Sequence, residues 1–229
     1  MPATTYYILN FPSSSKETGL VYPQVQKMSE GYDTKGPNAT RQLFRCWQEF
    51  PDFTPDLDSF VLHAKSKPTD FLSNALSARG MIVSDKVKTI FEAANTCPIR
   101  FYPAGLKYKG KSLEGYYWMH IISDYTGFVD YPNSSFFIYK TFTHNIGYIK
   151  IDSKEDLLNK EERLKKDNPQ HTLAIWAEKI KLLPEFDAAL DFFQIGKFTS
   201  DTYVSKRLQT RLEKEQVSGY DLSPATNLV

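Results

Sequence analysis

Alternating apolar and polar positions divide the chain into short strands joined by polar loops. Residues 5–10 are rich in β-branched and aromatic side chains and stop at Phe11-Pro12-Ser13, which predicts a first strand and a loop. Residues 116–122 are apolar on both alternating faces, so we expect this strand at the centre of a sheet covered on both sides. Further strands are predicted at 58–64, 99–107, 136–142 and 147–151, with a hairpin turn at Lys109-Gly110-Lys111. The segments 173–182 and 188–195 fit either strand or helix by periodicity, and their aromatic and β-branched content favours strand.

Helical spacing of apolar residues marks three other segments. Residues 43–50 carry one apolar face, and Pro51 ends the pattern. Thr69 and Asp70 have the form of a helix start, and Gly80 follows as the end of that helix. Ser153 begins a highly charged helix through a capping-box pattern. The predicted helices are therefore 40–50, 70–80 and 153–167.

An internal repeat is the most informative feature of the sequence. Residues 81–104 align without a gap to residues 202–225, and each copy has the pattern strand, serine, helix, strand. Ser84 and Ser205 are expected to cap the two helices, each accepting a hydrogen bond from a backbone amide of the first turn. Chance similarity between two ordinary units stays an alternative, which superposition decides. The identical pairs are Val83 and Val204, Ser84 and Ser205, Thr89 and Thr210, Glu92 and Glu213, Pro103 and Pro224, and Ala104 and Ala225.

These elements predict an α+β fold, with a mainly antiparallel sheet flanked by helices and two related strand-cap-helix-strand units. The length of 229 residues allows a full hydrophobic core. We expect residues 1–229 to form a single domain.

Composition and charge exclude several classes of partner. Lys plus Arg number 28 and Asp plus Glu 27, so no net field attracts nucleic acid or an anionic membrane. Cys46 and Cys97 have no metal or disulfide framework spacing, which is typical of reduced cytosolic thiols. The first residues lack the pattern of a secretory signal, and no apolar run is long enough to span a bilayer. We therefore expect a cytoplasmic location. No phosphate-binding loop occurs, and no cofactor is expected.

Six short motifs lie between residues 69 and 220: Thr69-Asp70-Phe71-Leu72, Val83-Ser84-Asp85-Lys86, Tyr116-Tyr117-Trp118-Met119-His120, Val129-Asp130-Tyr131-Pro132-Asn133-Ser134, Tyr203-Val204-Ser205-Lys206-Arg207-Leu208 and Ser218-Gly219-Tyr220. Together they resemble a bacterial immunity-protein family that is encoded beside polymorphic toxins and was first described as a domain of unknown function. The resemblance covers about residues 55–225 and leaves the first 50 residues unassigned. It implies that the chain neutralises a cognate toxin by direct binding, and it carries over no catalytic residues.

A dense aromatic group supplies the candidate anchors of a toxin interface. Such groups usually belong to a core, but adjacent aromatic residues on a strand point to opposite faces and cannot all enter the same core. Three lysines around the predicted hairpin are candidate rim charges, or else a defence against edge-to-edge pairing. The candidate toxin-interface residues are Tyr116, Trp118, Tyr125, Phe128, Tyr131, Lys107, Lys109 and Lys111.

The chain also carries acids and histidines that suggest a different kind of site. His120, Asp124, Asp130 and His144 lie within one stretch, but they lack the spacing of metal ligands or of a known catalytic motif. We therefore expect no metal site and no catalytic site. The alternatives to a toxin-binding immunity protein are an enzyme of unrecognised type using His120, Asp124 and Asp130, and a binding module unrelated to toxins.

Overall fold

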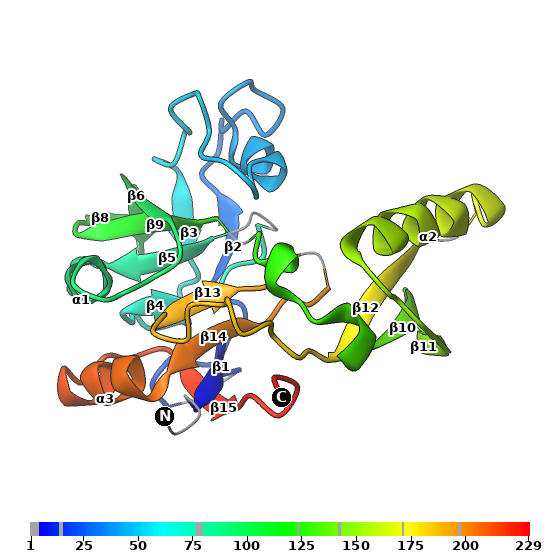
Figure 1. The fold of residues 1–229 in the computed structure, drawn as a ribbon. Helices are drawn as coiled ribbons and strands as arrows, with labels where there is room; N and C mark the ends of the chain where they lie inside the picture. The colour runs from blue at the N-terminus through cyan, green and yellow to red at the C-terminus, as the bar shows by residue number, and fades with distance from the viewer. Residues whose placement is uncertain are drawn as a thin grey trace.

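The structure is a computed structural model that describes residues 5–13, 16–76, 80–122, 124–141, 143–170, 172–196 and 198–229. The described residues form 15 strands and three α-helices. The strands lie in four small, mainly antiparallel sheets, which gives the α+β fold that the sequence predicts (Figure 1). Among the named strand pairs, β3 and β7 run parallel.

The first repeat unit is a four-stranded sheet with one helix, in the order β4-β5-β9-β6. Strand β9 lies between β5 and β6, so the prediction of a central strand at 116–122 is confirmed. Val87, Ile90 and Phe91 form the buried face of its helix. The elements of the first unit are β4 Phe71–Leu72, β5 Met81–Ser84, α1 Asp85–Glu92, β6 Ile99–Pro103 and β9 Tyr116–Ile121.

The second repeat unit has the same arrangement, in the order β13-β14-β1-β15. Its third strand, β1, comes from the N-terminal part of the chain rather than from the segment after the helix. Leu208 and Leu212 form the buried face of its helix. The elements of the second unit are β13 Phe192–Gln194, β14 Thr202–Ser205, α3 Lys206–Lys214, β15 Asp221–Pro224 and β1 Tyr6–Asn10.

Strand register shows that the two units correspond residue by residue. Ser84 pairs with Tyr116 in the first unit, and Ser205 pairs with Tyr6 in the second. The next position of β9, Tyr117, pairs with Pro103, and the matching Tyr7 pairs with Pro224. The repeat predicted from the sequence is therefore confirmed, and it is larger than residues 81–104 and 202–225.

The tyrosine at the start of each central strand has the same function in both units. The Tyr116 hydroxyl donates to the carbonyl of Thr69 at 3.1 Å. The Tyr6 hydroxyl donates to the carbonyl of Leu190 at 3.2 Å. Leu190 is the counterpart of Thr69 in the repeat, because the two are as far apart in the sequence as Ser205 and Ser84. Because β1 precedes the other strands of its unit along the chain whereas β9 follows the other strands of the first unit, the second unit is a permuted copy of the first.

Both serines cap a helix, as the sequence predicts. The Ser84 hydroxyl accepts the Val87 amide at 3.4 Å, and the Ser205 hydroxyl accepts the Leu208 amide at 3.1 Å. Each hydroxyl also donates to an aspartate: Ser84 donates to Asp70 at 2.7 Å, and Ser205 donates to Asp191 at 2.5 Å. This additional bond fixes the rotamer of each cap.

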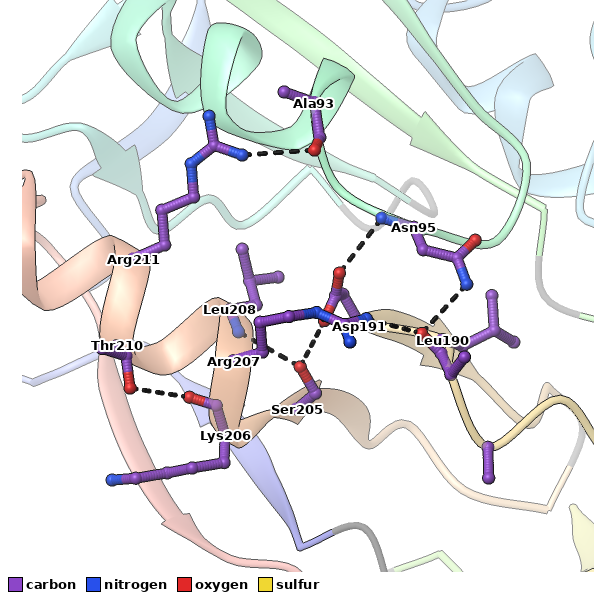
Figure 2. A network of polar contacts seen from close by, with 12 residues as sticks. Ala93, Asn95, Leu190, Asp191, Ser205, Lys206, Arg207, Leu208, Thr210 and Arg211 are labelled. Carbon is purple, nitrogen blue, oxygen red and sulfur yellow. Dashed lines mark hydrogen bonds and ion pairs between the residues drawn. The ribbon is translucent and has the colours of Figure 1, made fainter.

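The aspartates connect the two units to each other. Asp191 accepts the backbone amide of Asn95, which follows α1 of the first unit, at 3.1 Å, and it pairs with Arg207 Nε at 2.9 Å (Figure 2). In the other direction Asp70 accepts the amide of Ser218, which follows α3, at 2.9 Å. Each unit therefore binds the segment that follows the helix of the other unit.

A third sheet, in the order β2-β3-β7-β8, has a separate hydrophobic core. This core includes Phe60, Leu62 and Trp118, so it also reaches the opposite face of the first unit. A 3₁₀-helix, Thr40–Arg45, contributes the buried Leu43. The strands of the third sheet are β2 Val25–Met28, β3 Phe60–Leu62, β7 Leu106–Tyr108 and β8 Lys111–Leu113.

A fourth sheet and the longest helix form an arm that extends away from the two repeat units (Figure 1). Its strand order is β11-β10-β12, and α2 packs on one face through the buried Leu157. Two further 3₁₀-helices, Thr126–Phe128 and Tyr131–Asn133, precede the arm. The elements of the arm are β10 Ser135–Lys140, β11 His144–Ile149, α2 Lys154–Asp167 and β12 Leu173–Lys179.

Two helix predictions are wrong. Residues 40–45 form a 3₁₀-helix in place of an α-helix to residue 50, because Leu43 is buried while Phe44 is 55% exposed and the expected continuous apolar face is absent. Phe71 and Leu72 form strand β4 in place of a helix, because Asp70 binds Ser84 and Ser218 rather than capping a helix. Residues 77–79, 123 and 142 of the predicted segments lie outside the described residues.

Other boundaries are refined or confirmed. β6 pairs directly with β9, and the hairpin at Lys109-Gly110 joins β7 to β8 between them. The Ser153 hydroxyl accepts the Asp156 amide at 3.0 Å, which confirms the predicted start of α2. The segments 173–182 and 188–195 contain strands β12 and β13, as predicted.

Candidate protein-protein interface

The structure places three of the aromatic candidates mainly inside the protein. Trp118 has no exposed surface and stacks on Phe60, with ring centroids 6.1 Å apart. Tyr131 is 6% exposed, and its hydroxyl donates to the Thr126 carbonyl at 3.0 Å. Tyr116 is half-buried and uses its hydroxyl within the first unit. Burial raises the pKa of Tyr116 to about 12, with a smaller contribution from the charge of Asp70.

Tyr125 and Phe128 are half-exposed and lie beside each other. Their ring centroids are 5.9 Å apart, and both contact Phe186, at 5.8 and 6.0 Å. Tyr125 also contacts Phe193, which is fully buried. Tyr125 and Phe128 therefore pack at the edge of the main core, the cluster that both repeat units and the arm share, and each ring is partly exposed.

The three lysine candidates are all exposed. Lys107 lies on β7 and Lys111 on β8, while Lys109 occupies the turn between them with a positive φ of 50°. The Lys109 ammonium lies 4.8 Å from the centre of the Tyr108 ring. Since β8 is at the edge of its sheet, the positions fit both an interface rim and protection of that edge.

The acids and histidines each bind their own neighbours. His120 is fully buried and its Nε2 donates to the Cys46 carbonyl at 2.6 Å. Burial lowers the pKa of His120, which outweighs the opposing effect of that hydrogen bond. Asp124 accepts from Thr126 and Gln48, at 2.6 and 3.0 Å. In the part of the chain that the structure describes, no three His, Cys, Asp or Glu side chains are placed to hold a metal.

The remaining two members of that set belong to other regions. Asp130 binds the Asn133 amide group at 2.9 Å and lies 3.9 Å from Lys181 Nζ. His144 is exposed at the start of β11 in the arm, where its ring contacts Tyr139 at 5.8 Å. Asp130 therefore takes part in a local turn, and His144 takes part in the arm sheet.

The arm presents an aromatic sheet face that sequence reasoning missed. Phe137 on β10 pairs with Tyr148 on β11 and with Trp176 on β12, so the three side chains form one row across the sheet. Tyr139 stacks on Trp176 with centroids 4.4 Å apart and an interplanar angle of 13°. Tyr148 is 68% exposed and donates to Glu178 at 2.9 Å. We call Phe137, Tyr139, Tyr148 and Trp176 the arm face.

The opposite face of the same sheet is covered, whereas the arm face is partly exposed. Phe136 and Ile175 are 2% and 0% exposed and belong to the main core together with Leu157 of α2. The arm-face residues belong to neither of the two core clusters. On the arm face, Phe137, Tyr139 and Trp176 are partly buried and Tyr148 is exposed.

A cleft of about 580 Å³ continues from the arm face toward the repeat units. Trp176 lines it from the arm, and Asn10, Gln194 and Thr202 line it from β1, β13 and β14. The Gln194 amide donates to the Thr202 hydroxyl at 2.7 Å, so one wall is a fixed polar group. The combined surface has exposed aromatic rings beside ordered polar groups, a composition typical of protein interfaces.

These aromatic and polar groups form a candidate surface for binding another macromolecule. The model of the immunity protein family (Imm11) matches residues 5–227, and the chain therefore belongs to that family. The match includes residues 5–50, which the resemblance found in the sequence left unassigned. No curated protein matches the chain. No helix of the described residues is long and apolar enough to cross a membrane. Family membership suggests a non-enzymatic role.

Proposed function

We propose that this protein acts in the cytoplasm and neutralises a cognate bacterial toxin by binding it directly, without catalysis and without a cofactor. Membership of the immunity protein family supports the toxin as the partner. The open arm face is the observation that supports binding as the mechanism. One core cluster contains residues of both repeat units and of the arm, which supports treating residues 1–229 as a single domain.

The arm face has the properties of a binding centre. Large aromatic side chains supply contact area at a low cost in conformational entropy, and Tyr139 and Trp176 already hold each other in one conformation. Tyr148 adds a hydroxyl that Glu178 orients. Preorganised anchors of this kind carry most of the binding energy in tight complexes.

The exposed candidates from the sequence define two other surfaces in this proposal. Tyr125 and Phe128 expose part of their rings, and Lys107, Lys109 and Lys111 are exposed at the β7–β8 hairpin. Trp118 and Tyr131 would contact a partner only if the chain rearranged, because both side chains are buried. Tyr116 is partly exposed but uses its hydroxyl within the first unit. We therefore place the arm face first as the toxin interface.

Calorimetry against the toxin encoded beside this protein tests the proposal. We expect one-to-one binding, and we expect Tyr148→Ala and Trp176→Ala each to cost about 2 kcal/mol or more of binding free energy. Lys109→Ala, on the β7–β8 hairpin rather than on the arm, should leave the affinity almost unchanged if the arm face is the interface and should mainly slow association if the hairpin forms the rim. Phe44→Ala, at an aromatic residue that is 55% exposed on another element, is the matched control and should leave affinity unchanged.

Two results would count against the proposal in different ways. If the wild type fails to bind the neighbouring toxin while cells expressing it still survive, neutralisation does not work by direct binding. If binding is tight but only the variants at Tyr125 and Phe128, or only those at the hairpin lysines, weaken it, the toxin uses that surface in place of the arm face.

A further inference from the structure

Each repeat unit uses one edge of its sheet to hold a segment of the other unit. The Phe71 amide of β4 donates to the Ser218 carbonyl at 2.9 Å. At the equivalent edge, the Phe192 carbonyl of β13 accepts the Cys97 amide at 2.8 Å. A strand edge is a row of backbone N–H and C=O groups that pairs readily with another strand, and these contacts occupy that row. The opposite edges are β6 in the first unit and β15 in the second.

Strand register shows which backbone groups of β6 point away from its sheet. The Ala104 amide donates to the Tyr116 carbonyl at 3.0 Å, so the even-numbered residues of β6 are the ones hydrogen-bonded to β9. The N–H and C=O groups of Ile99 and Phe101, and the C=O group of Pro103, therefore point outward. Among the described residues, no backbone hydrogen bond uses these groups.

Other outer strands are better protected than β6. On β15, the Pro224 carbonyl already accepts the Thr226 amide at 2.9 Å. β11 carries a bulge, and the Asn145 side chain accepts the Gly147 amide at 2.8 Å. β8 has three residues and begins at Lys111. Since bulges, short length and lysines all hinder edge pairing, β6 is the edge best suited to accept a further strand.

A pocket of about 370 Å³ lies beside β6, on the same face of the sheet as α1. Phe91, Ile99 and Phe101 supply its apolar lining. Lys88 and Glu92 lie at its wall and pair with each other at 2.8 Å, so they add no net charge. An apolar side chain matches this pocket, because a charged group would lose water there without gaining a partner.

A strand added to β6 would place its alternate side chains in two different environments. Residues directly opposite Ile99 and Phe101 would point to the α1 face, beside the pocket. The residues between them would point to the other face, where the Arg100 guanidinium carbon lies 4.2 Å from the centre of the Phe50 ring. Backbone pairing would supply affinity in this arrangement, and the pocket would select the side chains.

We infer that the β6 edge binds an extended segment of a partner protein as an additional antiparallel strand, with apolar side chains opposite Ile99 and Phe101. The strand pairs of this sheet are all antiparallel, and antiparallel pairing is the more stable per residue. The site lies on the first repeat unit, and the inference does not depend on the arm face as the toxin interface.

A second copy of the chain fits this edge less well. Self-pairing of β6 about Phe101 sets Ile99 against Pro103, which has no N–H to donate. Self-pairing about Arg100 sets two like charges directly opposite each other. A partner segment avoids both conflicts.

Fluorescence anisotropy with the full chain and a labelled six-residue peptide that alternates valine and threonine tests the site. We expect saturable binding to the wild type. The valines are opposite Ile99 and Phe101 in the antiparallel arrangement, so their amides face β6 and the threonine amides face solvent. Methylation of the valine nitrogens should weaken binding about tenfold or more, whereas methylation of the threonine nitrogens should change it by no more than about twofold.

Ile99→Pro and Ile99→Ala test the same bond from the side of the protein. Both remove the isoleucine side chain, but only proline removes the outward N–H, and Pro103 shows that this edge accepts a proline at an outward position. We expect Ile99→Pro to bind the unmethylated peptide about tenfold more weakly than Ile99→Ala does. If Ile99→Pro unfolds in a thermal melt, the two methylated peptides decide the question.

Four results would each overturn the inference. The first is absence of peptide binding to the wild type, and the second is a loss with the threonine-methylated peptide that equals or exceeds the loss with the valine-methylated one. The third is equal affinity of folded Ile99→Pro and Ile99→Ala. The fourth is a wild-type dimer in sedimentation that Ile99→Pro abolishes, which would assign the edge to a second copy.

Discussion

In both repeat units an aspartate holds the serine that caps the helix, but the second unit buries its aspartate more deeply. The Asp191 side chain is 5% exposed and pairs with Arg207, whereas Asp70 is 14% exposed and pairs with Lys86 at 3.2 Å. Arg207 also donates to the Ala189 carbonyl at 2.7 Å, which fixes its guanidinium in place. The repeated backbone supplies the same bonds, and the burial around them sets how much each contributes to stability.

The units also differ in how their central strand is supplied. The first unit takes β9 from the segment that follows its own outer strand, while the second takes β1 from the N-terminal part of the chain. β1 pairs with β14 on one side and β15 on the other. The second unit is therefore closed by a segment that lies far away in the sequence.

Removal of β1 should have the largest effect of any change considered. Deletion of residues 1–10 leaves β14 and β15 without their shared partner and exposes the core around Tyr6 and Leu9. We expect the truncated chain to lose its cooperative unfolding transition in circular dichroism. A permuted chain that carries residues 1–13 after Val229 through a flexible linker should regain it. A truncated chain of wild-type stability would show that β1 is dispensable to the second unit.

Removal of the aspartates should come next. We expect Asp191→Ala to cost about 3 kcal/mol and Asp70→Ala about 2 kcal/mol, because each leaves buried donors unpaired and Asp191 is the more buried. Urea unfolding measures both. Asp221→Ala, an exposed carboxylate of the second unit, should change stability by no more than about 0.5 kcal/mol. Equal costs for Asp70 and Asp191 would show that burial does not distinguish the units.

Loss of the helix caps should have a smaller effect. Ser205→Ala and Ser84→Ala each remove one cap bond, at a cost of about 1 kcal/mol, with the larger loss at the buried Ser205. The double variant Ser205→Ala/Asp191→Ala should cost less than the two single changes together, since the partners share one bond. Thermal unfolding checks both statements, with Ser112→Ala on the exposed β8 hairpin as control. Strictly additive losses of stability would mean that the hydrogen bond between Ser205 and Asp191 contributes nothing.

The smallest expected effect is a pH dependence carried by Asp70. Burial disfavours its charged form, but hydrogen bonds from Ser84, Ser218 and Lys86 together outweigh burial and hold the pKa of Asp70 below its ordinary value. The unfolded chain therefore takes up this proton at higher pH, near the usual value of about 3.9, and the contribution of Asp70 is lost as pH falls below it. We expect the stability difference between wild type and Asp70→Asn to shrink over that range in urea titrations. A constant difference would contradict the assignment.

Local chemistry made much of the repeat predictable. Ser84 and Ser205 each precede a helix with apolar residues on one face, and both capping and periodicity are properties of short segments. The same reasoning located the start of α2 at Ser153 and the central strand at 116–122. It could not extend the repeat to β1, because β1 and β9 share tyrosine at the equivalent positions but little else, and they lie on opposite sides of β4 in the sequence.

Tertiary contacts decided the rest. Thr69 and Asp70 have the composition of a helix start, yet Asp70 binds Ser218 from the far end of the chain, and the segment becomes strand β4. The aromatic residues of 116–131 and of the arm are alike in the sequence, and only the cover over each sheet separates core from surface. Trp118 lies under the third sheet, while Trp176 lies on the side of its sheet that α2 does not cover. Strand periodicity determined that neighbouring side chains along each strand point to opposite faces of its sheet. The packing of distant segments determined which face of each sheet stayed exposed, because burial depends on neighbours that no local pattern specifies.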